Sequence, residues 1–471
     1  MKRDLATATK EKIGKEVTLY GWVNSRRDHG KIIFFDLRDR SGLVQVVASP
    51  KYPEAYKAAN SLGNEYVIEV HGTVNKRPEG NINPDLETGE VEIQADEIKT
   101  ITKCAELPLD VTSDGSDIDE TVRLKYRYLD LRRPRMQKNL RTRAAAAAFI
   151  RNWLTGEDFV EVETPILSKS TPEGARDFLV PSRLQKGKFY ALPQSPQQYK
   201  QLLMVAGVER YFQLPHVFRD EDLRGDRQIE HTQVDIEMSF VEQEDILGII
   251  ERLMIDLMEK CLHKKVLEKP FPRYSFEEAM KKFGADKFDL RKKKDPSTAA
   301  FAWVIDFPLF EWKEEEKRLD AVHHPFTSPR PSDIPLLDKE PEKAKAWQYD
   351  LVCNGFEVAG GSIRIHDPAV QSKIFEIMGH SKKAIEKKFG HLLEAFKFGV
   401  PPHGGIAIGF DRLLQATLPE KSIREVIAFP VAASGQTSVM DAPSEVEELQ
   451  LKELGLKAEK SEIPLSREKK E

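Results

Sequence analysis

The amino-acid sequence predicts an α+β protein with two domains, an N-terminal β-barrel and a larger domain in which helices flank a mostly antiparallel sheet. The chain has 471 residues, which exceeds the length at which a single hydrophobic core usually stops growing. Its first ~110 residues contain short segments of alternating apolar and polar residues. Beyond them, helix and strand signals are mixed, and the sequence contains neither a GxGxxG fingerprint nor a GxxxxGK[ST] phosphate loop.

Composition is that of a soluble globular protein, with 40% hydrophobic and 32% charged residues. Apolar runs fall far short of the ~20 residues that span a bilayer, and the N-terminus lacks the apolar stretch of a secretion signal. We therefore expect a cytoplasmic protein without a membrane partner. Cys104, Cys261 and Cys353 are odd in number and widely spaced, so we interpret them as packing residues. The net charge is −5, so a polyanionic partner would need local basic patches.

Five short strands are predicted in the first domain, at residues 17–24, 31–37, 43–48, 65–73 and 91–98. Five strands separated by turn signals are typical of a small Greek-key barrel of the OB type. Such barrels bind single-stranded nucleic acid with cations and stacking aromatic rings. The first hairpin offers both kinds of side chain: Arg26, Arg27, Lys31, Trp22, Phe34 and Phe35. The alternative is that the aromatic rings fill the barrel and the cations form a solvated face.

Residues 108–122 are polar and turn-rich, so we expect them to link a barrel domain at 1–107 to a second domain at 123–440. Residues 441–471 are dominated by Glu and Lys and are expected to form a charged tail. A densely basic run at 123–143 precedes a predicted helix at 144–154, which Gly156 can cap. A second helix is predicted to start at Ser195-Pro196, with serine at the N-cap and proline at the first helical position.

Residues 231–241 alternate strictly and predict a strand. The period of two places the mostly apolar residues on one face: Thr232, Val234, Ile236, Met238 and Phe240. Gln233, Asp235, Glu237 and Ser239 lie on the other face. One strand is therefore expected to present a row of polar groups toward a cleft.

Three further stretches combine charged residues with strand signals: residues 159–165 (FVEVETP), 217–227 (VFRDEDLRGDR) and 404–412 (GGIAIGFDR). In this order they resemble motifs 1, 2 and 3 of the class II aminoacyl-tRNA synthetases. Four stretches between them resemble the bacterial type of aspartyl-tRNA synthetase in particular: 171–177 (TPEGARD), 194–197 (QSPQ), 323–326 (HHPF) and 360–366 (GGSIRIH). The resemblance extends from the barrel to about Pro430.

This resemblance implies an anticodon-binding OB barrel, a class II catalytic domain, and ATP-dependent ligation of L-aspartate to tRNA through an aspartyl-adenylate. Attack of a carboxylate on the α-phosphate of ATP needs cations that spread the developing charge. By resemblance, Arg219 bridges the substrate carboxylate and the α-phosphate, and Arg412 holds the far end of the triphosphate. The other implied ATP-binding residues are Asp220, Glu221, Gln228, His231, Glu357, Gly409, Phe410 and Asp411.

The resemblance also implies a Mg²⁺ site at Asp350 and Glu357, whose carboxylates suit that cation. Their odd separation would place them on opposite strand faces unless the backbone bulges or turns, which Gly355 permits.

Aspartate recognition is implied for two groups of residues. Arg219, Arg364 and Lys200 match residues that bind anions, and they favour a carboxylate over the amide of an asparaginyl enzyme. Glu173, Gln197, Gln233 and Asp235 match acceptors for the substrate ammonium, and His323 is expected to close over the substrate. For each of these residues taken singly, the alternative is a surface ion pair or a polar group of the core.

The sequence departs from the family pattern in two places within the second domain. The insertion domain that bacterial enzymes carry between motifs 2 and 3 is missing near residues 285–300. His231 stands where the family commonly has a phenylalanine that stacks on adenine, and imidazole buries less apolar area.

In the barrel, His29 and Gly80 resemble the non-discriminating enzymes, which charge both tRNA(Asp) and tRNA(Asn). The expected anticodon contacts are Arg26, Arg27, Phe34 and Gln45. Alternatives are a discriminating enzyme that charges tRNA(Asp) alone and a catalytically silent RNA-binding paralogue. Motif 1 usually forms a dimer interface in this class, so the expected partners are tRNA, L-aspartate and a second copy of the chain, and not DNA.

Overall fold

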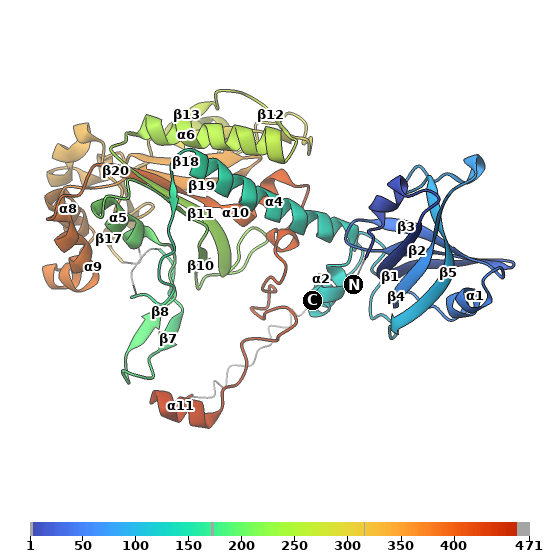
Figure 1. Cartoon of the computed structure of the whole chain (residues 1–471). Coiled ribbons are helices and arrows are strands. Elements are labelled where there is room, and N and C mark those ends of the chain that lie inside the picture. Colours follow the sequence, from blue (N-terminus) through green and yellow to red (C-terminus); the bar gives the residue numbers. More distant parts are fainter. Residues whose placement is uncertain (1–2, 171–173, 315, 459–471) are drawn as a thin grey trace, which may run out of the picture. The chain divides into compact units, whose positions relative to one another are not determined.

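The structure of the protein is a computed structural model that describes residues 3–170, 174–314 and 316–458 (Figure 1). It divides into two compact units, Met1–Ile118 and Asp119–Glu471. The division falls inside the predicted linker, and the first helix of the second unit begins at Glu120. In the described part of the chain, no helix is both long and apolar enough to cross a bilayer.

The first unit is a closed barrel with the strand order β1-β2-β3-β5-β4. Its elements are β1 (Glu16–His29), β2 (Ile32–Arg38), β3 (Leu43–Ala48), α1 (Pro53–Asn60), β4 (Val67–Lys76) and β5 (Val91–Thr102). The five predicted strands and the OB fold are confirmed. The two interpretations of the aromatic residues are each partly right, because Phe35 is fully buried in the barrel whereas Trp22 and Phe34 are half-exposed.

The second unit is built on a nine-stranded sheet with the order β13-β15-β18-β19-β20-β11-β9-β6, in which β10 pairs with β11. The strands are β6 (Val160–Glu161), β9 (Arg210–Gln213), β10 (His216–Phe218), β11 (Glu230–Ser239), β13 (Arg273–Ser275), β15 (Phe301–Ile305), β18 (Gln348–Cys353), β19 (Phe356–Ile363) and β20 (His403–Gly409). The β13–β15 and β6–β9 pairs are parallel, and the central pairs are antiparallel, as the sequence predicts.

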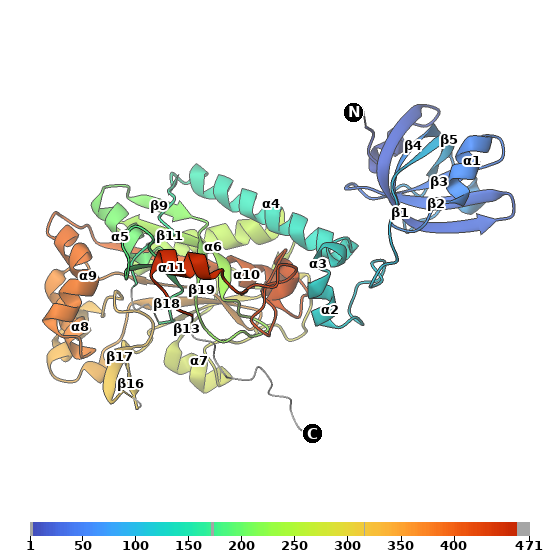
Figure 2. The same ribbon diagram turned by 90° about the horizontal axis from the view of Figure 1, so that it is seen from below.

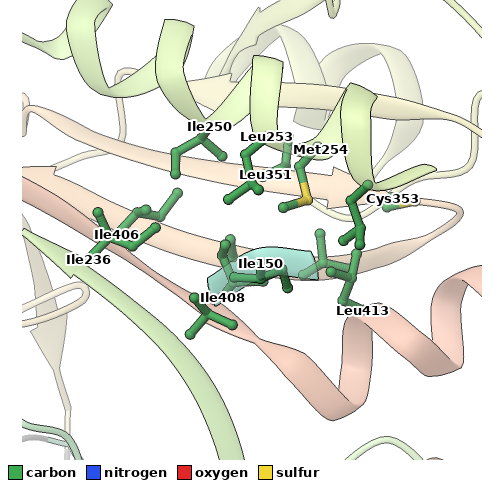
Figure 3. Close-up of a cluster of buried hydrophobic side chains, with 14 of the residues drawn as sticks. Ile150, Ile236, Ile250, Leu253, Met254, Leu351, Cys353, Ile406, Ile408 and Leu413 are labelled. Atoms are coloured by element: carbon green, nitrogen blue, oxygen red, sulfur yellow. The ribbon is translucent and has the colours of Figure 1, made fainter. Parts of the chain in front are cut away.

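The main hydrophobic core lies between this sheet and the helices α4 (Pro134–Gly156), α6 (Gln243–Asp256) and α10 (Phe410–Thr417). In Figure 3, Ile250, Leu253 and Met254 of α6 lie over Leu351 and Ile406 of the sheet. Alternation along β11 explains why this face is apolar, since Val234, Ile236 and Met238 enter the core at every second residue.

Helix α4 starts at Pro134, ten residues before the predicted helix, so part of the basic run is helical. The apolar period is weak there, but arginine and lysine are good helix formers and proline fits the first helical position. Helix α5 (Gln197–Val205) starts one residue later than predicted, with Pro196 at the N-cap position. The Ser195 hydroxyl accepts a hydrogen bond from the Gln197 N–H at 3.3 Å.

Smaller elements surround the sheet. They are α2 (Glu120–Lys125), α3 (Arg127–Asp130), β7 (Leu179–Pro181), β8 (Phe189–Ala191), α7 (Phe276–Phe283), β16 (Phe310–Lys313), β17 (Arg318–Ala321), α8 (Pro368–Ile377), α9 (Lys382–Phe396) and α11 (Glu448–Leu454). Helices α8 and α9 lie next to each other in Figures 1 and 2, and their rings Phe375 and Phe389 stack at a centroid distance of 4.4 Å. Helix α11 lies in the predicted tail, of which residues 459–471 are outside the described part of the chain.

Candidate active site

A cavity of about 310 Å³ lies in the second unit. Its walls come from α5, from β11 and the loop before it, from the β18–β19 hairpin, and from the junction of β20 with α10. Most of the predicted site residues line it: Gln197, Lys200, Arg219, Glu221, Gln228, His231, Gln233, Asp235, His323, Asp350, Glu357, Arg364, Gly409, Asp411 and Arg412. Residues that are distant in the sequence therefore converge on one site.

Strand β11 supplies polar side chains to the cavity because of its period of two. Gln233 and Asp235 line the cavity, whereas Val234 and Ile236 are buried in the hydrophobic core. The predicted strand runs two residues too far, because Phe240 follows β11 with a φ of 57° and a side chain that is 69% exposed.

The hairpin of β18 and β19 brings Asp350 and Glu357 to the same cavity. Its turn is formed by Asn354 and Gly355, which have φ values of 53° and 93°. This is the conformation that an Asn-Gly pair favours in tight hairpins. The register also shifts after Leu351, where the backbone bulges. The turn and the bulge together allow the two carboxylates to share one site despite their odd separation.

Four charged side chains form a buried network at one end of the site. Lys200 Nζ lies 2.8 Å from Asp235 Oδ1 and 3.0 Å from Glu237 Oε2. Arg364 donates from Nε and Nη2 to the two oxygens of Glu237, at 2.9 and 3.1 Å. Two cations and two anions balance within this network. Burial acts to raise the pKa of Glu237, but Arg364 and Lys200 outweigh it and lower the pKa to about 2.

Two adjacent histidines border this network and differ in their surroundings. His324 Nε2 accepts a hydrogen bond from Arg364 Nη1 at 2.8 Å, so that nitrogen carries no proton. Burial and the neighbouring Arg364 guanidinium hold the pKa of His324 well below its ordinary value. His323 Nε2 lies 3.4 Å from Asp350 Oδ2, and burial is here outweighed by Asp350, which raises the pKa of His323.

The opposite end of the site carries cations suited to phosphates. Arg412 donates from Nη1 to the Glu357 backbone oxygen at 3.1 Å, and Arg219 lines the same cavity. Burial, Arg219 and Arg412 together lower the pKa of His231 to about 3, so its imidazole is neutral at pH 7. The neutral imidazole therefore adds no further positive charge to the end of the site that holds Arg219 and Arg412.

Asp411 is buried although it belongs to the predicted ATP-binding set. One of its oxygens accepts the Thr232 N–H at 2.8 Å, and the other pairs with Arg143 of α4. The Arg143 guanidinium also lies over the Phe410 ring, 5.0 Å from its centroid. Asp411 therefore ties the start of α10 to strand β11 and helix α4.

Two predicted ATP-binding residues do not line the cavity. Phe410 packs in the hydrophobic core, because the first turn of α10 directs it to the opposite side from Arg412. Asp220 lies 3.6 Å from Arg176, with which it forms an isolated bridge. Predicted contacts of these two side chains with ATP are not supported by their positions. Glu173 lies outside the described residues.

The structure adds site residues that the sequence interpretation missed. Ser195, His324, Gln348 and Lys287 line the cavity, and Glu237 completes the charged network. Glu237 shares the polar face of β11 with Asp235, so the strand pattern contained a signal for it. Lys287 lies in an irregular segment after α7, where no periodicity marks it.

In the barrel unit, one face carries several of the predicted anticodon contacts. Arg27 lies opposite Phe34 in the β1–β2 register and hydrogen-bonds Asp36 at 3.2 Å. Gln45 donates to Glu92 at 3.0 Å on the neighbouring strands. Arg26 lies opposite the buried Phe35 and donates to Ala59 O of α1 at 3.2 Å. Because neighbours on a strand alternate, Arg26 does not share the face of Arg27.

The two residues predicted to govern tRNA discrimination are His29 and Gly80. The His29 ring packs edge-on against Phe34, at a centroid distance of 5.8 Å. Gly80 belongs to a single turn at Glu79–Asn81, and a side chain added there would meet open space.

Comparison with known proteins identifies both units. Residues 119–433 match the family described as "tRNA synthetases class II (D, K and N)", and residues 17–101 match "OB-fold nucleic acid binding domain". An asparaginyl-tRNA synthetase from Pyrococcus horikoshii, complexed with asparaginyl-adenylate, has the same fold, with a TM-score of 0.74 and 22% identity over 91% of this chain and 98% of its own.

Closer relatives are found by sequence. The Aspartate--tRNA(Asp/Asn) ligase of Rubrobacter xylanophilus is 42% identical over 566 aligned positions, which cover 94% of each chain. That of Caldanaerobacter subterraneus is 43% identical over 570 positions, covering 94% of this chain and 96% of the relative. The alignments are longer than the 471 residues of this chain, so the relatives contain segments that it lacks. The chain belongs to the aspartate--tRNA ligases, within the class II tRNA synthetases.

Proposed function

We propose that this protein joins L-aspartate to tRNA at the expense of ATP, and that it charges both tRNA(Asp) and tRNA(Asn). The observation that carries the choice of amino acid is the buried network of Arg364, Lys200, Glu237 and Asp235. The two cations of the network can bind the side-chain carboxylate of aspartate, and its anions can bind the ammonium group of aspartate.

In this proposal Arg364 and Lys200 bind the side-chain carboxylate of aspartate, while Asp235, Gln233, Gln197 and Glu173 accept hydrogen bonds from its ammonium. His323 closes over the substrate. An asparagine amide would bring no negative charge to these two cations when Asp235 turns to the substrate ammonium, which is a costly mismatch. The network therefore disfavours an asparaginyl enzyme.

The α-carboxylate oxygen of aspartate attacks the α-phosphorus of ATP, the bond to the β-phosphate oxygen breaks, and pyrophosphate leaves. Arg219 stabilises charge at the α-phosphate, and Arg412 binds the terminal phosphates. Glu221 and Gln228 position the nucleotide, and His231 stacks on adenine. In the second step a ribose hydroxyl of the tRNA end attacks the aspartyl carbonyl carbon, and AMP leaves.

Asp350 and Glu357 are the residues that would hold Mg²⁺. Among the described residues, no group of three or more His, Cys, Asp or Glu is arranged to hold a metal ion. Two carboxylates in a phosphate site still fit this cation, because Mg²⁺ is usually held by one or two carboxylates together with substrate phosphates and water. Bound there, Mg²⁺ would neutralise phosphate charge.

We place anticodon recognition on the barrel face with Arg27, Phe34 and Gln45, and tolerance of both anticodons on His29 and Gly80. Phe34 is partly exposed and offers an aromatic ring for stacking, and the open space at Gly80 leaves room for either base. The similarity to two relatives named Aspartate--tRNA(Asp/Asn) ligase supports this specificity.

Three further properties belong to this proposal. A homodimer is supported by exposed apolar residues in and after motif 1, since Val160, Ile166 and Leu167 are each 52% exposed. A missing insertion domain near residues 285–300 is supported by the short segment that joins α7 to β15. A cytoplasmic location follows from the proposed use of tRNA.

The experiment that tests the function is attachment of labelled aspartate, with labelled asparagine as the control, to purified tRNA(Asp) and tRNA(Asn). We expect aspartate on both tRNAs and asparagine on neither. Charging of tRNA(Asp) alone would overturn the assignment of His29 and Gly80 but keep the ligase. Charging of neither tRNA would favour the RNA-binding paralogue without catalysis.

A further inference from the structure

Lys287 enters the active-site cavity from a segment to which the family motifs assign no role. Helix α7 ends at Phe283, and Gly284 follows in the left-handed region with a φ of 74°. The chain then turns back, so that Lys287 lines the cavity and its Nζ lies 2.9 Å from Glu357 Oε2. Lys287 thus lies in the loop where the insertion domain is missing, and it forms an ion pair with Glu357, a proposed Mg²⁺ ligand.

The backbone around Lys287 is anchored. Phe288 is buried and stacks on Phe283, with ring centroids 3.9 Å apart and planes 14° apart. The Phe288 carbonyl accepts the Gly355 N–H at 3.1 Å, which ties the segment to the turn between β18 and β19. On the other side, Asp289 pairs with Arg291 at 2.8 Å. Lys287 is therefore fixed to the hairpin that carries Asp350 and Glu357.

Lys287 and Arg412 approach the same residue from different elements. Arg412 binds the backbone oxygen of Glu357, and Lys287 binds its carboxylate. Glu357 and Arg364 lie at opposite ends of β19, roughly 20 Å apart along the strand. Lys287 and Arg412 therefore lie far from the end of β19 that binds the aspartate side chain in the proposed function. They lie at the Glu357 end, where the terminal phosphates of ATP would bind.

The Lys287–Glu357 pair is easily exchanged. The side chains of Lys287 and Glu357 are 45% and 30% exposed, and ion pairs with this much solvent contact contribute little to stability. The terminal phosphates of ATP carry more negative charge than a single carboxylate, so they can compete with Glu357 for the Lys287 ammonium.

Building on the proposed function, we propose that Lys287 is a phosphate-binding residue. In the nucleotide-free site it neutralises Glu357. When ATP binds, its ammonium donates to the β- or γ-phosphate, and Glu357 becomes available to the divalent cation. Lys287 thus contacts the pyrophosphate part of the substrate, and neither the adenosine nor the aspartate.

Calorimetric titration of the full chain with ATP and, separately, with AMP in the presence of Mg²⁺ tests this. Lys287→Met should weaken ATP binding about 10- to 100-fold and AMP binding less than about twofold, because AMP lacks the two terminal phosphates. Lys287→Arg, which keeps the cation, should restore most of the ATP affinity. Lys281→Met, at an exposed lysine of α7, is the matched control and should leave both affinities unchanged.

Unchanged ATP affinity in Lys287→Met would overturn the inference. An equal loss of ATP and AMP affinity would also overturn it, because it would reveal a structural role. Failure of this inference can be distinguished from failure of the proposed function by measuring aspartate-dependent ATP–pyrophosphate exchange with the unaltered protein. If exchange is absent but ATP binding still depends on Lys287, the function fails and the phosphate contact stands.

Discussion

Glu237 binds the guanidinium of Arg364 through both carboxylate oxygens, and its second oxygen also lies 3.0 Å from the Lys200 ammonium. All three side chains are almost completely buried. The carboxylate therefore fixes the direction of two cations that are proposed to meet the substrate. Its charged partners are both cations of the aspartate end, Lys200 and Arg364, so its effect should be confined to that end of the site.

Glu237→Gln should destabilise the second unit by about 3–5 kcal/mol, because it leaves buried positive charge without its partner. In variants that still fold, the KM for aspartate should rise more than the KM for ATP, since Arg364 loses its orientation. Urea unfolding and aspartate-dependent ATP–pyrophosphate exchange measure the two effects.

The matched control is Glu311→Gln, which breaks an exposed pair with Lys313. Its cost should stay within about 1 kcal/mol. Equal losses of stability in the two variants would contradict the role assigned to burial at Glu237.

Changing His29 to Leu together with Gly80 to Lys should reduce charging of tRNA(Asn) more than charging of tRNA(Asp). A side chain at Gly80 meets open space and its φ is not positive, so the barrel should keep its fold. A tenfold difference between the two tRNAs corresponds to about 1.4 kcal/mol, within the range of one lost base contact. The kcat/KM values for both tRNAs provide the measurement, and an equal fall for both would argue against discrimination at these positions.

Local patterns predicted the parts of the site that depend on neighbouring residues. The period of two in β11 placed Gln233 and Asp235 on one face, and the Asn354-Gly355 turn made a shared site for Asp350 and Glu357 possible. The first strand was predicted to end at residue 24, so the sequence assigned Arg26 and Arg27 to no strand face. The strand continues to His29, and alternation then places Arg26 and Arg27 on opposite faces.

Tertiary packing determined the site features that the sequence patterns did not predict. Lys287 reaches Glu357 because Phe288 packs against Phe283, and no periodicity in the sequence encodes that contact. Phe410 belongs to a family motif, but helix geometry turns its ring into the core while Arg412 faces the cavity. A motif thus identified the segment, and the fold decided which of its side chains meet the ligand.

The proposed dimer predicts that acidic substitutions in the segment after motif 1 produce monomers. Ile166 and Leu167 are both half-exposed, and β6 forms one end of the sheet order. Ile166→Asp with Leu167→Asp would introduce charges into an apolar contact, where each unpaired charge costs several kcal/mol. Light scattering should show the mass of two chains for the unaltered protein and of one chain for the variant. Met280→Asp, at an exposed methionine of α7, should remain dimeric, and a monomeric unaltered protein would refute the dimer.

Stability should fall with decreasing pH in part because of His403. Its Nδ1–H donates to Pro401 O at 2.8 Å, so Nε2 is left as the acceptor for Gln201 at 3.1 Å. Burial lowers the pKa of His403 to about 4, whereas an unfolded chain has a histidine pKa of about 6.5. The unfolded state therefore binds the proton first. This contribution to stability is complete above pH 6.5 and is lost as the pH falls toward 4, by about 1.4 kcal/mol per pH unit.

His403→Gln should remove that dependence, because glutamine can accept the hydrogen bond from Gln201 and does not titrate. Urea unfolding at several values between pH 4.5 and 6.5 measures how the free energy of unfolding changes with pH. The slope should be smaller in the variant by about 1.4 kcal/mol per pH unit, which corresponds to the uptake of one proton on unfolding. His366→Gln, at an exposed histidine, serves as the control and should keep the slope of the unaltered protein. An unchanged slope in His403→Gln would mean that His403 is solvated in the native state, because only a buried neutral imidazole can couple its titration to folding in this direction.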